Sequence, residues 1–420
     1  MLPNHRTSQC SNLLSPLPPL PPEIWRIIMA FAARPCVHGS SALDAPDSGH
    51  SPDPLALAVA ATRPTVLRTK LSLLLVSKHW HGMALDILYE HVTFTSQEFL
   101  TQSLAAIAES GFETSPFRST KSLVLCTIDW EEWDIPVVKV ITLCENLRAL
   151  VLTRPFPING NRTRLVINAI PSTLVALAFI GWCTAKIVEM LSSFQKLEIL
   201  SLLSSWHNGS TCRPIFPHVR HITLSHDHWQ GWGSHFPDAH HLSIIISQNR
   251  FLPSGATFQN FGTTDQKKVA HLSIGIETWF PKYMKFGDII CARFIRAFQN
   301  LVILSYNPFI LDVSGSYPFE THPTLQSVRH YIEIPEISHS RENVDKELQA
   351  RYKPSWVQSW NWLHDGEDKF PSLKSIVGVY KCEGASESEK DLLCYVKRLG
   401  GYDSKLTFVC TLQCNESRIY

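Results

Sequence analysis

Histidine and cysteine are the side chains of this sequence with the clearest capacity for metal chemistry. The chain has 19 histidines and 11 cysteines, and its densest histidine groups are His79 with His81, His226 with His228, and His240 with His241. A structural zinc site needs such histidines at short spacing from a cysteine pair. Cys410 and Cys414 form a pair near the end of the chain, but no second pair stands at a suitable distance. We therefore expect structural or surface histidines, no metal site and no cofactor.

A second group of residues with chemical potential is acidic. It contains Asp129, Glu131, Glu132 and Asp134, which lie around two tryptophans. Paired carboxylates can hydrolyse a glycosidic bond, but a solvated loop is the favoured interpretation. The sequence has no nucleophile-elbow, P-loop, dinucleotide-binding or zinc-protease motif. We predict no catalytic residues and a protein that is not an enzyme, and an enzyme with an unrecognised site stays open as an alternative.

The charge balance and the cysteines indicate which classes of partner and which cellular compartment to expect. The 420 residues carry 38 Lys and Arg against 37 Asp and Glu, a formal net charge of +1, which favours neither nucleic acid nor a membrane as a partner. Scattered cysteines, odd in number, and the lack of a signal peptide indicate a reducing compartment, the cytoplasm or the nucleus. No apolar run approaches the roughly 20 residues that span a bilayer.

The N-terminal elements centre on Leu20 to Phe31, with the sequence LPPEIWRIIMAF. Its two prolines suit a first helical turn, where a missing N–H costs nothing. One apolar stripe recurs at i, i+3, i+4 and i+7 and consists of Ile24, Ile27, Ile28 and Phe31. Trp25 and Met29 form a second stripe beside it. A helix that is apolar over so much of its girth needs cover from more than one side.

A second helical stretch runs from Lys70 to Phe94. Its apolar residues step by three and four, which predicts one continuous stripe made of Leu73, Val76, Trp80, Met83 and Ile87. Between the two stretches, the chain is rich in Pro, Gly and Ser, and the part from His38 to Pro54 predicts a flexible loop. Residues 1–19 are polar and then Pro-rich, which predicts a disordered tail.

Together the two stretches resemble an F-box of the fungal type. The matching residues are Leu20, Pro21, Glu23, Ile24 and Ile28, followed by Leu73, Val76, Ser77, Lys78 and Trp80. The resemblance implies a helical domain over residues 20–94 with an insertion at about 35–66. It also implies docking on the Skp-family linker protein of a cullin–RING ubiquitin ligase, through Leu20, Pro21, Ile24, Trp25, Ile28, Val76 and Trp80. Two core helices of an ordinary helical subdomain are the alternative.

A repeat of the form apolar-x-x-apolar-x-apolar runs through the rest of the chain. It predicts ten strands, whose central residues are Leu123, Leu150, Leu177, Leu200, Ile222, Leu242, Leu272, Leu304, Val328 and Ile376. Most of these residues recur at intervals in or near the period of leucine-rich repeats. Short helices are expected between strands at 137–144, 187–194 and 289–298, after a helix at 97–108. A Phe before several strands is expected to close the turn against the core, and residues 405–412 are expected to form a closing strand. The region over about 115–380 resembles that family without its asparagine ladder. The resemblance implies an irregular solenoid over 95–420, with a C-terminal cap and an extended concave surface that holds a protein substrate.

The predicted fold class is α+β, a small all-α F-box-like domain followed by an irregular α/β leucine-rich-repeat-like solenoid. An α/β domain with accidental motif matches is the alternative. Trp356, Trp360 and Trp362 belong either to the core or to an interface. The predicted function is substrate recognition for an SCF-type ubiquitin ligase, with the cullin complex and an unknown protein substrate as partners. A leucine-rich-repeat-like interaction scaffold with no ubiquitin-ligase role is the alternative function.

Overall fold

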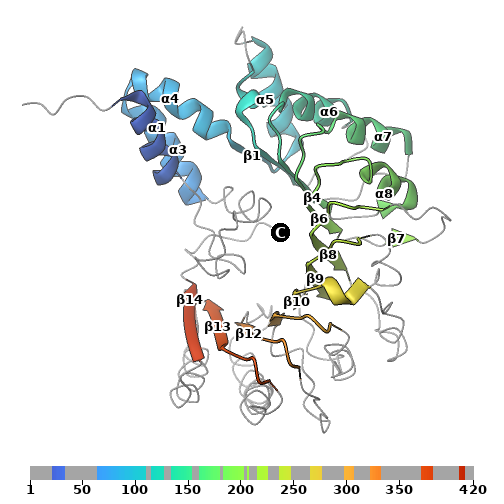
Figure 1. Cartoon of the computed structure of the whole chain (residues 1–420). Coiled ribbons are helices and arrows are strands. Elements are labelled where there is room, and N and C mark those ends of the chain that lie inside the picture. The colour runs from blue at the N-terminus through green and yellow to red at the C-terminus, as the bar shows by residue number, and fades with distance from the viewer. Residues whose placement is uncertain are drawn as a thin grey trace, which may run out of the picture.

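One parallel β-sheet organises the described part of the molecule (Figure 1). The structure is a computed structural model, and it describes residues 21–33, 64–109, 115–126, 134–153, 160–179, 183–202, 206–207, 215–225, 236–246, 265–276, 298–306, 322–332, 370–381 and 406–411. Helices precede the sheet and connect several of its strands, so the arrangement is α/β. No described helix has both the length and the apolar character needed to cross a membrane.

Three helices precede the first strand: α1 (Pro22–Ala32), α3 (Pro64–Val76) and α4 (Lys78–Tyr89). Helix α1 begins after Pro21, whose carbonyl accepts hydrogen bonds from the backbone N–H groups of Ile24 and Trp25 at 3.0 and 3.2 Å. Pro22 fits this first turn because its missing N–H would have no helical partner there. Helices α3 and α4 are separated by Ser77, which has an extended backbone with φ −163° and caps α4.

The main sheet has 12 strands that follow the order of the chain. They are β1 (His91–Phe94), β2 (Ser122–Leu125), β3 (Ala149–Leu152), β4 (Ala176–Phe179), β6 (Ile199–Leu202), β8 (His221–Ser225), β9 (His241–Ile246), β10 (His271–Ile276), β11 (Ile303–Tyr306), β12 (Ser327–Ile332), β13 (Ser375–Lys381) and β14 (Leu406–Thr411). Every neighbouring pair in this sheet is parallel. A second sheet pairs β5 (Cys183–Thr184) with β7 (Trp206–His207).

Helical segments lie between several strands, most of them in the first half of the sheet. They are α5 (Gln97–Glu109), the 3-10 helix η2 (Pro116–Ser119), α6 (Asp134–Leu143), α7 (Gly160–Ala169), α8 (Ala185–Leu191) and the 3-10 helix η6 (Asp265–Lys268). Figure 1 shows α6, α7 and α8 along one side of the sheet. The predicted helices at 97–108, 137–144 and 187–194 are thereby found, within a few residues of their expected ends.

The register of the sheet aligns the ten predicted central residues with one another. Leu123 pairs with Leu150, and the same row continues strand by strand to Val328 and Ile376. From Leu123 to Val328 these side chains are buried. They form one continuous core with the inward residues of α6, α7 and α8. The ten strand predictions are therefore confirmed. The central side chains share one face because successive side chains of a strand point to opposite faces of the sheet.

The turns that lead into the later strands carry a buried aromatic ring, as the sequence predicts. These rings belong to Phe216, Phe236, Phe298 and Phe370. Phe216 and Phe236 stack on each other with ring centroids 5.0 Å apart. All four rings belong to the core of the sheet, so each one closes its turn against that core.

The predicted fold class is wrong. Strand β1 lies inside the region assigned to a small all-α domain, yet it pairs in parallel with β2 from His91 to Phe94. Tyr89 and Val92 also pack against the core of the sheet. The described residues therefore form one α/β arrangement and not a helical domain followed by a solenoid. The missed signal was the run Val92, Thr93 and Phe94, because all three residue types are enriched in strands. A strand this short is not stable alone, so the run also indicates a partner strand.

Other expectations fall outside the described residues. They concern the tail 1–19 with Leu20, the loop at about 38–54, the acidic residues 129–132, the tryptophans at 356–362 and the predicted helix at 289–298. The closing strand predicted near residues 405–412 is β14, which pairs in parallel with β13.

Candidate functional site: the apolar face of the N-terminal helices

The two apolar stripes of α1 lie in different environments. Met29 is fully buried and forms a small cluster with Met83 and Ala84 of α4. Trp25 packs against the same cluster, and its ring lies 4.9 Å from that of Trp80, at an interplanar angle of 52°. The second stripe of α1 is therefore the one that holds the helix against the rest of the chain.

The first stripe of α1 faces away from that cluster. Ile27 and Phe31 are 64% and 77% exposed, and Ile24 and Ile28 are 41% and 42% exposed. We call these four residues the outer stripe. Isolated exposed apolar residues are ordinary on protein surfaces, whereas a contiguous apolar patch marks an interaction site. Four large side chains on one helix face make the outer stripe a patch of this kind.

Helix α3 repeats the division between an inner and an outer face. Val66 and Lys70 are buried on its inner face, where Leu73 and Leu74 pack against the methionine cluster. Its outer face carries large exposed side chains at i, i+4 and i+8, which are those of Leu67, Leu71 and Leu75. Leu75 is 86% exposed. Both helices therefore present apolar side chains that the described part of this chain leaves uncovered.

A group of charged and polar side chains joins the helices to the sheet. We call this group, which consists of Lys70, Glu90, His91, Lys121 and Ser122, the joint. The Nζ of Lys121 donates a hydrogen bond to the Glu90 carboxylate at 2.6 Å. His91 Nδ1 lies 2.6 Å from the Ser122 hydroxyl. The backbone N–H groups of Lys121 and Ser122 both donate to the carbonyl of Glu90. Helix α4 and strand β1 are thereby fixed to β2.

Burial sets the protonation of the joint. It lowers the pKa of Lys70 to about 8, although the Glu90 carboxylate acts in the opposite direction. Burial also lowers the pKa of His91 to about 4, with the charge of Lys70 as a further cause, so His91 is neutral at pH 7. Burial alone would raise the pKa of Glu90, but the hydrogen bond from Lys121 and the nearby cations lower it. Glu90 is therefore the ionised partner of this group.

The structure separates the predicted docking residues into two sets. Pro21, Ile24, Ile28 and Val76 are exposed. Trp25 and Trp80 are half-buried and pack on each other, so they support the helices and do not form the outer surface. Four residues of the predicted stripe lie in or against the methionine cluster, namely Leu73, Trp80, Met83 and Ile87. The stripe is interrupted near Ser77, where the helix breaks, and Val76 is 59% exposed.

Several exposed residues were not predicted as docking residues. They are Ile27 and Phe31 on α1 and Leu67, Leu71 and Leu75 on α3. The sequence did contain a signal for them. Ile27 and Phe31 belong to the predicted first stripe, and the leucines of α3 recur every four residues, as one face of a helix requires. What the sequence could not supply was which of two adjacent stripes is covered by the chain itself.

Neither a scan against protein-family models nor a search of curated proteins found a match for this chain. Within the described residues, no group of three or more His, Cys, Asp or Glu side chains is placed to hold a metal ion.

Proposed function

We propose that this chain is the substrate-recognition adaptor of an SCF-type cullin–RING ubiquitin ligase, active in the cytoplasm or the nucleus. Its N-terminal helices bind the Skp-family linker protein, and its sheet region holds a protein substrate. The chain itself carries out no covalent chemistry in this proposal. It raises the local concentration of a substrate next to the ligase, which lowers the entropic part of the barrier.

The observation that carries the proposal is the outer stripe of α1. The second stripe of α1 is already packed on α4, and the described residues leave the four large apolar side chains of the outer stripe exposed. Covering such side chains with a partner removes apolar area from water, at about 25 cal/mol for each Å². The F-box-like order of residues around this helix indicates which partner this is, the Skp-family linker.

The joint supports the same proposal. An adaptor has to hold its substrate at a fixed distance and orientation from the ligase, because a flexible link lowers the effective concentration. Helix α4 continues directly into β1, and the bonds between Glu90, Lys121, His91 and Ser122 fasten this connection to β2. A linker protein bound to α1 would therefore be held in a defined position relative to the sheet.

Binding of the purified full-length chain to the purified Skp-family linker tests the proposal. The double substitution Ile27→Asp with Phe31→Asp places two charges in the outer stripe and should weaken binding by at least about 100-fold, as expected for central apolar anchors. Ala30→Asp is the matched control, because residue 30 is exposed on the same turn but lies outside the stripe. It should leave binding within about threefold of the unmodified chain.

Two outcomes count against the proposal. If the unmodified chain does not bind the linker, the adaptor role is overturned and the interaction scaffold without a ligase role is favoured. If the double variant binds as well as the Ala30→Asp control, the outer stripe is not the docking surface. Circular dichroism of all three proteins shows whether a loss of binding comes from a loss of fold.

A further inference from the structure

The chain that leads into α1 carries a dense run of prolines. Residues 15–22 read SPLPPLPP, and five of these eight residues are proline. A proline suits the first turn of a helix, and Pro22 fills that position in α1. The other four prolines of the run are not needed to begin the helix. We call residues 15–22 the proline run.

The residue order of the proline run restricts its backbone. A proline ring holds φ at about −65°, and the residue before a proline is disfavoured in the α region. Every residue of the run either is a proline or directly precedes one. The sequence therefore predicts a polyproline II segment ahead of α1, which is a left-handed helix without internal hydrogen bonds and with a fully solvated backbone.

Pro21, the last residue before α1, has the predicted conformation. Its φ is −52° and its ψ is 145°, which lies in the polyproline II region within the ordinary scatter. Pro21 and Pro22 are both exposed. At its junction with α1, the run is thus both extended in the predicted way and accessible to a partner.

Two Leu-Pro pairs repeat within the proline run. Leu17 with Pro18 and Leu20 with Pro21 are three residues apart. Polyproline II has three residues per turn and rises about 3.1 Å per residue, so this spacing predicts both pairs on one side of the segment, about 9 Å apart. Proline-rich segments with the PxxP pattern bind aromatic-lined grooves, and their restricted backbone leaves little entropy to lose on binding.

The proline run and its approach carry no charge. No Asp, Glu, Lys or Arg lies between Arg6 and Glu23. A partner of this segment would therefore be held by apolar contacts, and its affinity should depend little on ionic strength, unlike that of a partner held by exposed charges.

We propose that the proline run binds the aromatic-lined groove of an SH3 domain, with Leu17 and Pro18 in one apolar cleft and Leu20 and Pro21 in the next. The repeated Leu-Pro pair favours this module, because two neighbouring clefts of one groove accept two pairs that lie on the same side of the segment. The proposal goes beyond the adaptor role and does not depend on it.

Biolayer interferometry with the full-length chain and a panel of purified SH3 domains tests the proposal. At least one domain should bind, and raising NaCl from about 0.1 to about 0.5 M should change its affinity by less than about twofold. The double variant Leu17→Ala with Pro18→Ala should bind at least about tenfold more weakly, because it removes one of the two apolar pairs. Pro19→Ala is the matched control. It lies between the pairs and should stay within about fivefold, since it loses only backbone restriction.

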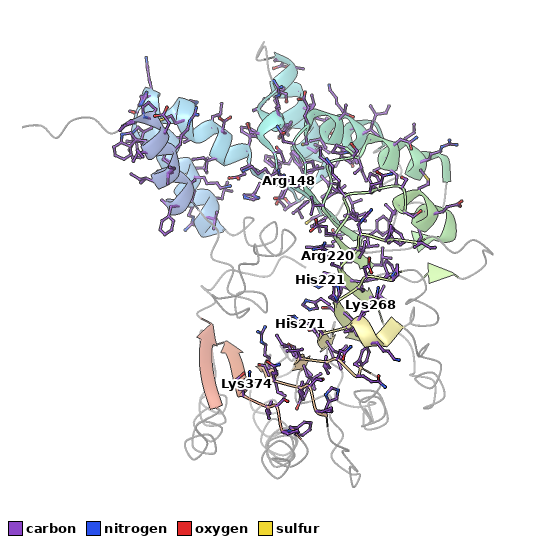
Figure 2. The ribbon with its side chains drawn as sticks, viewed as in Figure 1. Arg148, Arg220, His221, Lys268, His271 and Lys374 are labelled. Carbon is purple, nitrogen blue, oxygen red and sulfur yellow. The ribbon has the colours of Figure 1, made fainter. Side chains whose placement is uncertain are left out.

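A second control tests whether the domain is held by charge elsewhere on the chain. Arg148 and Arg220 are exposed and directly precede β3 and β8. Figure 2 shows both on the sheet, away from α1. The double variant Arg148→Gln with Arg220→Gln should bind the SH3 domain as the unmodified chain does. A loss of binding in this variant would mean that cations of the sheet hold the domain, and would overturn the proposal.

Three other outcomes overturn the proposal. One is a panel in which no SH3 domain binds, and another is a domain that binds the variant of Leu17 and Pro18 as tightly as the unmodified chain. The third is a WW domain that binds through the same residues more tightly than every SH3 domain tested. Circular dichroism of this variant should be unchanged, because both residues precede α1.

The linker protein separates this proposal from the proposed function. Its binding is measured on the same samples of the Leu17 and Pro18 variant, which should retain it fully because neither residue belongs to the predicted docking set. If the linker binds and no SH3 domain does, the proline run has no such partner and the adaptor role stands. If an SH3 domain binds and the linker does not, the adaptor role fails and the proline run is a ligand in a protein of another function.

Discussion

The N-terminal helices and the sheet of this protein differ in where their apolar side chains lie. In the sheet, the central residues of the strands from Leu123 to Val328 point into one closed core and are almost fully buried. In α1 and α3, Phe31 and Leu75 are more than three-quarters exposed. The sheet thus completes its core within the chain, whereas the described residues leave the outer faces of α1 and α3 uncovered. The difference agrees with the proposed function, in which the sheet supplies stability and the helices supply the interface.

The largest expected effect is the loss of stability when a leucine in the core of the sheet is truncated. The same truncation on the outer face of α3 should have almost no effect, and equal losses would contradict the difference between the two regions. Leu200→Ala removes a fully buried side chain from the middle of the sheet and should lower the free energy of unfolding by about 3 kcal/mol. Leu75→Ala removes the same atoms from an exposed position and should change it by less than about 0.5 kcal/mol. Urea unfolding of both variants provides the measurement. Equal losses would show that the outer face of α3 is structural.

The second effect concerns the joint between the two regions. Lys70 is buried and its pKa is lowered from 10.5 to about 8. The unfolded chain therefore binds more protons than the folded chain between those values, and the contribution of Lys70 to stability rises with pH through this window. Lys70→Met should stabilise the protein at pH 7 by roughly 2–3 kcal/mol. The gain should vanish near the upper end of the window.

Unfolding free energies of the Lys70→Met variant and the unmodified chain, measured side by side at several pH values, test this expectation. Lys267→Met is the control, since this lysine is exposed in η6. A constant difference between Lys70→Met and the unmodified chain across the window would mean that Lys70 is not desolvated in solution, and that the joint is open to water.

A third prediction compares the packed stripe of α1 with its outer stripe. Trp25→Ala removes the half-buried ring that packs on Trp80 and should destabilise the helices by about 2 kcal/mol, less than a fully buried tryptophan would. Ile27→Ala should have almost no effect on stability. Thermal unfolding followed by circular dichroism separates the two. If Ile27→Ala destabilises as strongly as Trp25→Ala, the outer stripe is covered by this chain.

The smallest expected effect concerns the break between α3 and α4. The Ser77 hydroxyl accepts a hydrogen bond from the backbone N–H of Trp80 at 3.2 Å, so Ser77→Ala should cost about 1 kcal/mol. Ser103→Ala, within the exposed side of α5, should cost less because its hydroxyl returns to a helix carbonyl. Urea midpoints of the two variants test the difference. A neutral Ser77→Ala would mean that the break has another cause.

The core of the sheet was predictable from the sequence because strand alternation is a local property. The ten central residues were placed correctly without any knowledge of their partners, and the repeat fixed their register as well. His221, His241 and His271 could have been placed side by side in the same way, since each stands one residue before a central residue. Residues 20 or more positions apart become neighbours once the register is known.

The environment of the two stripes of α1 and the fold class could not be predicted, because both depend on tertiary contacts that the spacing of apolar residues does not reveal. The sequence showed two apolar stripes on α1, but only packing against α4 decides that Trp25 and Met29 are covered. For this reason Trp25 was predicted on the docking surface, with Trp80 in support, whereas the two half-buried rings pack on each other. The fold class was wrong because β1 has only four residues, and so short a strand is recognised through its partner β2 more than through its own pattern.

Amide hydrogen exchange of the full-length chain, with and without the Skp-family linker, tests the central claim most directly. The outer stripe should be covered in the complex, so exchange should slow in residues 22–32 of α1 and remain unchanged in β8 to β10. A complex that forms while α1 exchanges as in the free chain, with protection confined to the sheet, would contradict the claim. In that case, the linker would occupy the surface that this account reserves for the substrate.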